Sequence, residues 1–340
     1  MIILSDCLTE KVDEGCLKVA NSLTERIKNK YPKTIVASYG RKPKHSDIHF
    51  QLNKVFLNKS LLSFINKEKQ SVLYIPFASN TKASVLRTFI LSLAVSKGLS
   101  VIFALRFPMN KMTKVLLKMS GAEIIALSRE SYDFYKKEIG NAVYLKTGID
   151  TKQFVPVNKA EKIRLRKKYA VAEGKKVLLH IGHLKDGRNI DKLLKISSDY
   201  HVFLVVSSAT ESEKDVILRT KLKERPNTTI IESYLEHVEE VYQMADVYLF
   251  PVQKEENCID IPLSVLEAAA CNIPIVTTDY GELKEFRREH GFYFISSLND
   301  KELNSAIDKM AEMKNCNNRQ AVLKYDWDNA VDILAAGQEK

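Results

Sequence analysis

The sequence of 340 residues lacks the features of three common protein classes. It has five cysteines, an odd number, with no CxxC pair, so we expect reduced, buried thiols and neither a disulfide framework nor a zinc site. Its longest apolar stretch, FILSLAVSKGL from Phe89, is shorter than the ~20 residues that span a bilayer. The start, MIILSD, has no basic residues before its apolar run, so we expect no signal peptide there. These absences predict a cytoplasmic globular protein.

Charge is present but unevenly distributed. The composition, 45% hydrophobic and 28% charged, is ordinary for a globular protein, and the length favours two domains because single cores stop growing near ~250–300 residues. The net charge is +10, yet residues 1–150 contain 24 Lys and Arg against 12 Asp and Glu, and residues 151–340 contain 28 against 30. The asymmetry indicates either an anionic partner for the first half or a lysine-rich solvated surface.

Short β-branched runs alternate with stretches of helical periodicity along the chain. Near-continuously apolar strands separated by helices are typical of parallel sheets covered on both faces. The fold class is therefore α/β, with two doubly wound Rossmann-like domains. Residues 41–60 give no clear pattern. The expected strands are MIIL, TIVAS, SVLYI, SVIFAL, EIIAL and AVYLK in the first half, and KVLLHI, HVFLVV, TTII, DVYLF, IPIVTT and GFYFI in the second.

The stretch TGIDTKQFVPVN, with Gly, Pro and polar residues, marks a domain boundary. It predicts an N-terminal domain over 1–150 and a C-terminal domain over 151–325. The helix of about 326–340 is a candidate to pack back on the first domain. Ligands bind at the carboxyl ends of parallel strands, so two facing sheets would form a site in the cleft between them.

The first motif that could bind a ligand is HIGHLKDGRNID. An apolar strand ends at Gly182, a polar loop follows, and a helix is expected to start near Asn189. Helix amides and the helix dipole favour phosphate by ~0.3–1 kcal/mol, and Arg188 and Lys185 add positive charge. The alternative is a plain turn in which Gly187 has positive φ and Arg188 is solvated. There is no GxGxxG, so the dinucleotide fingerprint is absent.

The second motif is IDIPLSVLEAAACNIPIVTTDYGELKE. Pro262 suits a first helical turn, so we expect a helix over Pro262–Ala270 with free amides and the Ser264 hydroxyl at its start. Glu267 follows one turn later. It is either on a solvated helix face, as most glutamates are, or a buried carboxylate that accepts two hydroxyls, as a ribose presents them. The apolar neighbours LSVL and AAAC favour the second interpretation.

The two motifs, in this order and separation, resemble those of the retaining glycosyltransferases of family 4, which have the GT-B fold. Gly182 matches the glycine of the family's GRLxxxKG motif, with His183 at its arginine and Arg188 at its lysine. Glu267 matches the second glutamate of its E-x7-E pair, and LEAAACNIPIVTTDYGELKE follows the rest of that motif. Weaker similarity, in YLEHVEEVYQMADVYLFP, YLKTGIDTKQF, IIALSRESYDFY and DEGCLKVANSL, extends the resemblance over nearly the whole chain.

The resemblance implies a hexosyltransferase that binds its acceptor on the N-terminal domain and a UDP- or GDP-sugar donor on the C-terminal domain, without a metal or other cofactor. Its product would belong to cell-surface glycan, glycolipid or glycoconjugate biosynthesis. The leaving diphosphate would assist deprotonation of the acceptor hydroxyl, so the protein supplies charge stabilisation and positioning. By this resemblance, Arg188, with His183 or Lys185, neutralises the diphosphate, and the amides of Leu263, Ser264 and Val265 hold phosphate oxygens. Glu267 binds the ribose, and Tyr234 lies near the base. Gly15 lets the first domain approach the diphosphate.

Two positions depart from the family pattern. Ile259 stands eight residues before Glu267, where the family has the glutamate that contacts the sugar, and Asp260 is the nearest substitute. Arg106 takes the place of the family's first-domain histidine; arginine cannot be a general base, but it can clamp a phosphate or an anionic acceptor. The alternative function is therefore a non-catalytic partner subunit that binds a nucleotide-sugar. The LEAAAC and PIVTTD stretches argue against an epimerase.

The stretch MNKMTKVLLKMSG predicts a basic amphipathic helix. It could lie on an anionic membrane surface, which would make the protein peripheral on the inner face, or pack on its sheet with its lysines outward. Nucleic-acid binding would need an aromatic and basic platform, which we do not find. The helix has Lys111, Lys114 and Lys118 on one face and Met112, Val115, Leu116 and Met119 on another.

The remaining metal-like and titratable residues have ordinary interpretations. DWD at 326–328 resembles a metal-binding DxD, but we interpret it as the cap and first turn of the last helix, so no metal is expected. His180 and His201 lie in or beside strands and are predicted to be structural residues with satisfied hydrogen bonds.

Overall fold

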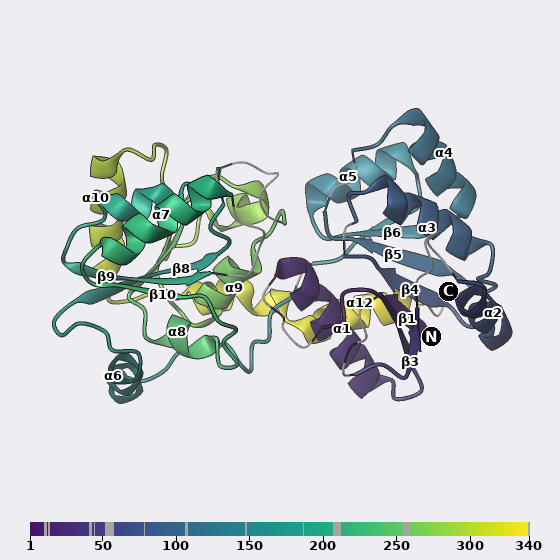
Figure 1. The fold of residues 1–340 in the computed structure, drawn as a ribbon, viewed down its shortest axis with the longest axis horizontal. Coiled ribbons are helices and arrows are strands. Elements are labelled where there is room, and N and C mark those ends of the chain that lie inside the picture. The colour runs from purple at the N-terminus through teal and green to yellow at the C-terminus, as the bar shows by residue number, and fades with distance from the viewer. Residues whose placement is uncertain are drawn as a thin grey trace. The chain divides into compact units, whose positions relative to one another are not determined.

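The computed structural model describes residues 1–338, except 10, 11, 13, 41, 42, 44, 52–57, 78, 106, 107, 147, 186, 207–211 and 254–258, and only the backbone of 335–338. The chain divides into two compact units. Unit 1 is Met1–Gly148 with Trp327–Lys340, and unit 2 is Ile149–Asp326. Each contains a parallel sheet with helices against it, which confirms the α/β class (Figure 1).

Unit 1 is built on a seven-stranded sheet. Its strands are β1 (Ile2–Ser5), β2 (Ile35–Tyr39), β3 (Ile48–Phe50), β4 (Val72–Ile75), β5 (Leu99–Phe103), β6 (Glu123–Ala126) and β7 (Ala142–Tyr144). Their order is β3-β2-β1-β4-β5-β6-β7, and every pair is parallel. The predicted strands are confirmed. Strand β3 was not predicted, because its three residues are only half-buried and so carry no apolar run.

Helices lie on both faces of this sheet. They are α1 (Gly15–Lys30), α2 (Lys59–Glu68), α3 (Lys82–Ser92), α4 (Lys111–Ser120), α5 (Arg129–Glu138) and α12 (Trp327–Gln338). Alternate strand residues, such as Ile2 and Leu4, share a core with Val85 of α3 and Leu117 of α4. In Figure 1, α3, α4 and α5 are seen in the upper part of unit 1, and α1 and α12 are seen at about the height of β1. Asn110 caps α4, whose last turn ends at Gly121 with φ 62°.

Unit 2 is built on a six-stranded parallel sheet. Its strands are β8 (Lys176–Gly182), β9 (Tyr200–Val206), β10 (Thr228–Ile231), β11 (Val247–Phe250), β12 (Ile275–Thr277) and β13 (Phe292–Phe294). Their order is β10-β9-β8-β11-β12-β13. All six were predicted, because each is a run of β-branched and aromatic residues that the core buries.

The helical elements of unit 2 are α6 (Lys159–Lys168), η1 (Ile190–Lys195), α7 (Glu213–Glu224), α8 (Glu239–Gln243), α9 (Leu263–Ala270), η3 (Gly281–Phe286), α10 (Asp300–Ala311), α11 (Asn318–Val322) and η4 (Leu323–Tyr325), where η marks a 3₁₀ helix. Leu303 and Ile307 of α10 join Leu178 and Val247 in one core. Helices α7 and α8 lie on opposite faces of the sheet (Figure 1). No helix in the described part of the chain is long and apolar enough to cross a membrane.

The two ends of unit 2 lie side by side. Ile149 forms a parallel bridge with Asp326, whose carboxylate accepts hydrogen bonds from the backbone and hydroxyl of Thr151. The Arg319 guanidinium donates to the carbonyls of Thr151 and Phe154. The chain therefore enters and leaves unit 2 at one place.

Candidate functional site

The order of the unit 2 sheet defines where a ligand would bind. Strand β8 has β9 on one side and β11 on the other, so the connections that leave β8 and β11 diverge at their carboxyl ends. Parallel sheets bind ligands at such a switch point. The residues at this place are those that follow Gly182 on β8 and Phe250 on β11.

Gly182, Arg188 and His180 come together at the end of β8. A Cβ at Gly182 would lie 2.9 Å from Arg188 Nη1 and 3.2 Å from His180 Nε2, so a larger residue here would require the Arg188 side chain to shift. The Arg188 side chain is buried, at 6% exposure, and the alternative of a solvated arginine is therefore wrong. A buried guanidinium beside a bare backbone is a cation placed where a phosphate could approach.

The two ring nitrogens of His180 have different surroundings. Nδ1 lies 2.8 Å from the Leu249 carbonyl, which can only accept, so Nδ1 carries the proton and Nε2 is an acceptor. Nε2 has no hydrogen-bond partner among the described residues, so the prediction that His180 is fully satisfied is wrong. Burial, with the nearby Arg188 charge, lowers the pKa of His180 to about 4. His180 therefore presents a neutral acceptor atom beside Arg188.

The loop after β8 is fixed by two left-handed residues. Gly187 has φ 83°, as the plain-turn alternative expected, and Asn189 has φ 58°. The Asn189 amide donates to the Pro251 carbonyl at 2.8 Å and so ties this loop to the end of β11. The expected helix near Asn189 is only the six-residue 3₁₀ helix η1, because the left-handed Asn189 precedes it. Arg188 and the exposed Lys185, and not a helix dipole, therefore supply the positive charge of this loop.

Glu267 is buried on α9, at 3% exposure, which agrees with the interpretation of a buried carboxylate. The Tyr242 hydroxyl, itself fully buried on α8, donates to Glu267 Oε2 at 2.6 Å. Burial and the Glu267 charge raise the pKa of Tyr242 well above its usual value, so this hydroxyl remains a donor. Tyr242 was not predicted as a site residue, because it lies 25 positions before Glu267 in the short helix EEVYQ, which matches no motif.

A chain of aromatic contacts connects the two predicted centres. The rings of Tyr242 and Tyr248 lie 5.8 Å apart, and Tyr248 stacks on His180 at 6.4 Å with a 16° interplanar angle. Glu267 thus reaches Arg188 through packed side chains on α8, β11 and β8. A rigid layer of this kind holds two polar groups at a fixed separation beneath a binding surface.

The start of α9 differs from the prediction by one residue. Pro262 is the N-cap, with φ −64° and ψ 118°, and the helix begins at Leu263. The Val265 amide was predicted to hold a phosphate oxygen. It donates instead to the Pro262 carbonyl at 3.1 Å, so it is not available to a phosphate. The amides of Leu263 and Ser264 have no acceptor among the described residues. These two remain the donors that the helix start can offer.

The loop before α9 is held by a close backbone contact. The Asp260 carbonyl accepts from the Glu282 amide at 2.9 Å, and a Cβ at Gly281 would lie 2.1 Å from that carbonyl oxygen. Ile259 is buried at 6% exposure, and Asp260 is half-buried. The position of the family's first glutamate is thus occupied by a core side chain.

The roles of the other predicted residues stay predictions. Gly15 is the first residue of α1 in unit 1, Tyr234 is 46% exposed after β10, and His183 is half-buried. Arg106 lies outside the described residues. Among the residues whose placement is described, no three His, Cys, Asp and Glu side chains are arranged to hold a metal ion.

Comparison with known proteins agrees with this architecture. Residues 161–325 match the family model described as glycosyl transferases group 1. The alpha-galactosylglucosyldiacylglycerol synthase of Streptococcus pneumoniae is 21% identical over 143 residues, which are 40% of this chain and 37% of that protein. The matched part therefore spans little more than a third of this curated relative.

Solved structures resemble the whole chain. HepE from Anabaena, crystallised in complex with UDP and glucose, has a TM-score of 0.76 at 15% identity and covers 100% of this chain and 99% of its own. A glycosyltransferase from Rickettsia africae has a TM-score of 0.77 at 13% identity, with coverage of 99% and 97%. These likenesses show the fold. Residues 161–325 are therefore a glycosyltransferase domain of group 1, in a chain that has the GT-B glycosyltransferase fold.

Proposed function

We propose that this protein is a retaining glycosyltransferase of family 4 that moves a hexosyl group from a nucleotide-sugar to an acceptor hydroxyl. The buried Arg188 beside Gly182, at the switch point of a group 1 domain, carries the proposal. Arg188 binds the donor diphosphate, with Lys185 and the amides of Leu263 and Ser264, and Glu267 binds the ribose.

The proposed reaction needs positioning and charge stabilisation from the protein. The bond from the acceptor oxygen to the sugar carbon forms on the face from which the diphosphate leaves, and the acceptor proton passes to the departing diphosphate. Arg188 stabilises the charge that develops on that diphosphate. Because side-chain cations supply this charge, we expect turnover to be unaffected by EDTA.

The proposed donor is UDP-glucose or a related UDP-sugar, and a GDP-sugar is the second choice. The resemblance to HepE, whose crystals contain UDP, UDP and glucose, or UDP-glucose, supports UDP. The proposed pathway is the synthesis of a glycolipid or another cell-surface glycoconjugate. The weak similarity to a glycolipid synthase supports this choice.

Donor hydrolysis and transfer test this function. The purified protein, given UDP-glucose, should release UDP, and Arg188→Ala and Glu267→Ala should each lower the rate by at least tenfold. Arg219→Ala is the control, because that guanidinium pairs with Glu232 near the surface of α7. Equal rates in Arg188→Ala and the wild type would reject the proposed role of Arg188.

The buried Ile259 favours a second candidate, a partner subunit that binds a nucleotide-sugar without catalysis. A site that holds the nucleotide but lacks the sugar-contacting carboxylate would bind UDP-glucose and not turn it over. Calorimetric binding of UDP-glucose, together with no UDP release with or without acceptor glycosides, would favour this candidate.

We also propose that unit 1 associates with an anionic membrane surface through α4. Thr113 and Leu117 bury the inner face of this helix, while Met112, Val115 and Met119 are 61%, 54% and 66% exposed. These three share one stripe at i, i+3 and i+7, next to the lysine face. A basic helix with an exposed apolar stripe fits an interfacial helix. Leu93, which follows the neighbouring α3, adds an apolar side chain that is 74% exposed.

Vesicle sedimentation tests this association. Phosphatidylglycerol vesicles should sediment the protein at low salt, and substitution of Lys111, Lys114 and Lys118 by glutamate should abolish binding, since each basic residue contributes about 1 kcal/mol near such a surface. Vesicle binding should be weakened, but not abolished, by substitution of serine for Met112, Val115 and Met119. The matched control changes Val216 and Ile217, exposed on α7, to serine. Absence of sedimentation of the wild-type protein would reject the membrane proposal.

A further inference from the structure

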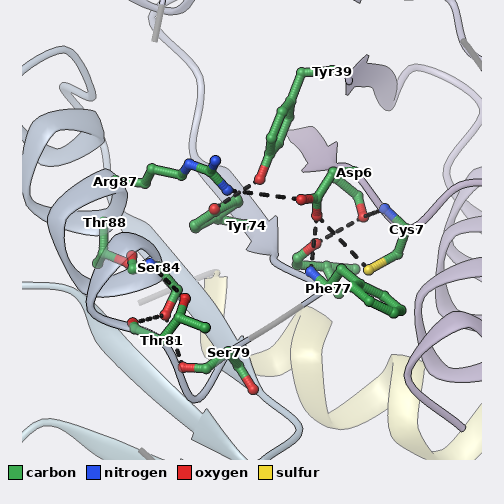
Figure 2. Close-up of polar contacts among 12 residues, drawn as sticks. Asp6, Cys7, Tyr39, Tyr74, Phe77, Ser79, Thr81, Ser84, Arg87 and Thr88 are labelled. Atoms are coloured by element: carbon green, nitrogen blue, oxygen red, sulfur yellow. Dashed lines mark hydrogen bonds and ion pairs between the residues drawn. The ribbon is translucent and has the colours of Figure 1, made fainter. Parts of the chain in front are cut away.

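Unit 1 has a switch point of its own. Strand β1 has β2 on one side and β4 on the other, so the connections that leave β1 and β4 diverge at their carboxyl ends. Asp6 follows β1 there, and Phe77 follows β4 (Figure 2). Arg87 reaches the same place from α3. We call Asp6, Phe77 and Arg87 the strand-end group.

The Asp6 carboxylate is held from one side. The Phe77 amide donates to Asp6 Oδ1 at 2.8 Å. Ser5, the last residue of β1, donates its hydroxyl to the Ile75 carbonyl at 2.7 Å and accepts from the Cys7 amide, which fixes the backbone on both sides of Asp6. About a fifth of the Asp6 side chain, 22%, is exposed.

The Arg87 guanidinium is held from another side. It lies over the Tyr39 ring, 5.5 Å from the ring centre, and the Tyr39 hydroxyl is 2.8 Å from that of Tyr74. Burial raises the pKa of both tyrosines, so both hydroxyls are neutral. The start of α3 is fixed in turn by the Thr81 cap and by the Ser84 hydroxyl, which donates to the Ser79 and Thr81 carbonyls (Figure 2).

These separate supports keep the two charges apart. Arg87 Nη1 is 3.8 Å from Asp6 Oδ2, beyond hydrogen-bond distance, although both side chains are about four-fifths buried. Elsewhere in unit 1 oppositely charged groups close to contact, at 3.0 Å for Arg26 with Asp328 and 2.8 Å for Lys28 with Asp47. An oxygen atom placed beside the Asp6–Arg87 pair can lie about 2.8 Å from both groups.

We propose that the strand-end group binds the acceptor and selects a neutral, hydroxyl-bearing sugar ring. This inference rests on the proposed glycosyltransferase function. A hydroxyl accepts from Arg87 and donates to Asp6 at the same time, which a phosphate or an ammonium cannot do, because Asp6 repels the anion and Arg87 repels the cation. The Phe77 ring, 40% exposed beside Asp6, offers an apolar platform for the C–H face of the ring.

The test uses the full chain and a panel of methyl glycosides. Ligand-observed NMR should detect at least one of methyl glucoside, galactoside and mannoside, each as both anomers, and should not detect competition by glucose 1-phosphate. Asp6→Asn should lower the affinity for the bound glycoside by about tenfold, because the amide still accepts from Phe77 but turns a donor toward Arg87. Phe77→Ala should weaken it by a similar factor.

Asp47→Asn is the matched control. Asp47 also accepts from a backbone amide, that of Val36, and pairs with a cation, Lys28, but at contact distance. It should leave glycoside binding unchanged. Because Asp6→Asn could act through folding, the thermal midpoint and UDP affinity of each variant are measured too, and both should stay within error of the wild type.

The outcomes separate the two proposals. If the wild type binds UDP but none of the glycosides, or if Asp6→Asn binds them unchanged, the acceptor assignment is wrong and the donor function stands. If the wild type binds neither UDP nor UDP-glucose, the proposed function itself fails. Transfer to methyl glycosides in solution, compared with transfer to glucosyl diacylglycerol in vesicles, shows whether the ring is offered free or as a lipid headgroup.

Discussion

At the residue scale, the buried His180 links folding to pH. The folded pKa of His180 is lowered to about 4, whereas an unfolded histidine titrates near ~6.5. As the pH falls through this window, the unfolded chain binds a proton that the folded chain does not, so the folded state loses stability. The lost free energy of unfolding is on the order of 3 kcal/mol by pH 4.

His180→Phe should remove this acid sensitivity. Urea unfolding between pH 4 and 7 should show a flatter dependence for the variant than for the wild type, and the difference should lie between pH 4 and 6.5. The same slope in both proteins would contradict the buried, neutral state of the ring.

The hydroxyl of Tyr242 gives a second prediction at this scale. Tyr242→Phe removes the donor at 2.6 Å from the buried Glu267 carboxylate, so the free energy of unfolding should fall by about 1–3 kcal/mol. Tyr248→Phe is the control, because that hydroxyl donates to a neutral acceptor, the Ile181 carbonyl, at the longer distance of 3.3 Å. An equal fall in the free energy of unfolding of the two variants would show that the hydrogen bond to Glu267 stabilises the fold no more than the one to the Ile181 carbonyl.

The loop before α9 provides a prediction at the scale of an element. Gly281→Ala combines φ +47° with a Cβ 2.1 Å from the Asp260 carbonyl oxygen, so the loop that carries Asp260 must shift. The matched control is Gly174→Ala, with φ +72° and nothing within 4 Å of the Cβ. The free energy of unfolding of the control should fall by about 1 kcal/mol, from backbone strain alone. In urea unfolding, Gly281→Ala should lose more free energy of unfolding than the control does. It should also bind UDP more weakly.

Sequence patterns predict elements better than contacts between elements. All twelve predicted strands are present, because burial on both faces selects continuous apolar runs. The short α11 and η4 were not predicted, since they connect α10 to the returning chain without a long periodic face. The burial of Glu267 could be predicted from its neighbours along α9.

Other features of the site depend on residues distant in sequence. The proton on His180 Nδ1, which makes Nε2 an acceptor, is fixed by the Leu249 carbonyl of β11, 69 positions away. No local pattern in β8 predicts this contact. The same is true of the 3.8 Å separation of Asp6 and Arg87, which three strand ends and a helix determine together.

At the scale of the whole molecule, unit 1 is completed by the last helix. Trp327, Ala330, Val331 and Leu334 of α12 are buried, and the Trp327 ring would lie 2.4 Å from a Cβ at Gly148. A chain that ends at residue 326 should therefore lose hydrogen-exchange protection in unit 1, most of all in α1, which packs on α12. Strands β8–β13 should keep theirs. Protection lost equally in both units would contradict this assignment of α12.

The return of the chain also sets an order of events during biosynthesis. Unit 2 is an insertion within unit 1, since residues 149–326 are made between the two parts of unit 1. A ribosome adds ~5–20 residues per second, so unit 2 is synthesised before the α12 helix that completes unit 1. The half of the protein that is synthesised first is therefore finished last, and its uncovered face is the one exposed to chaperones in the meantime.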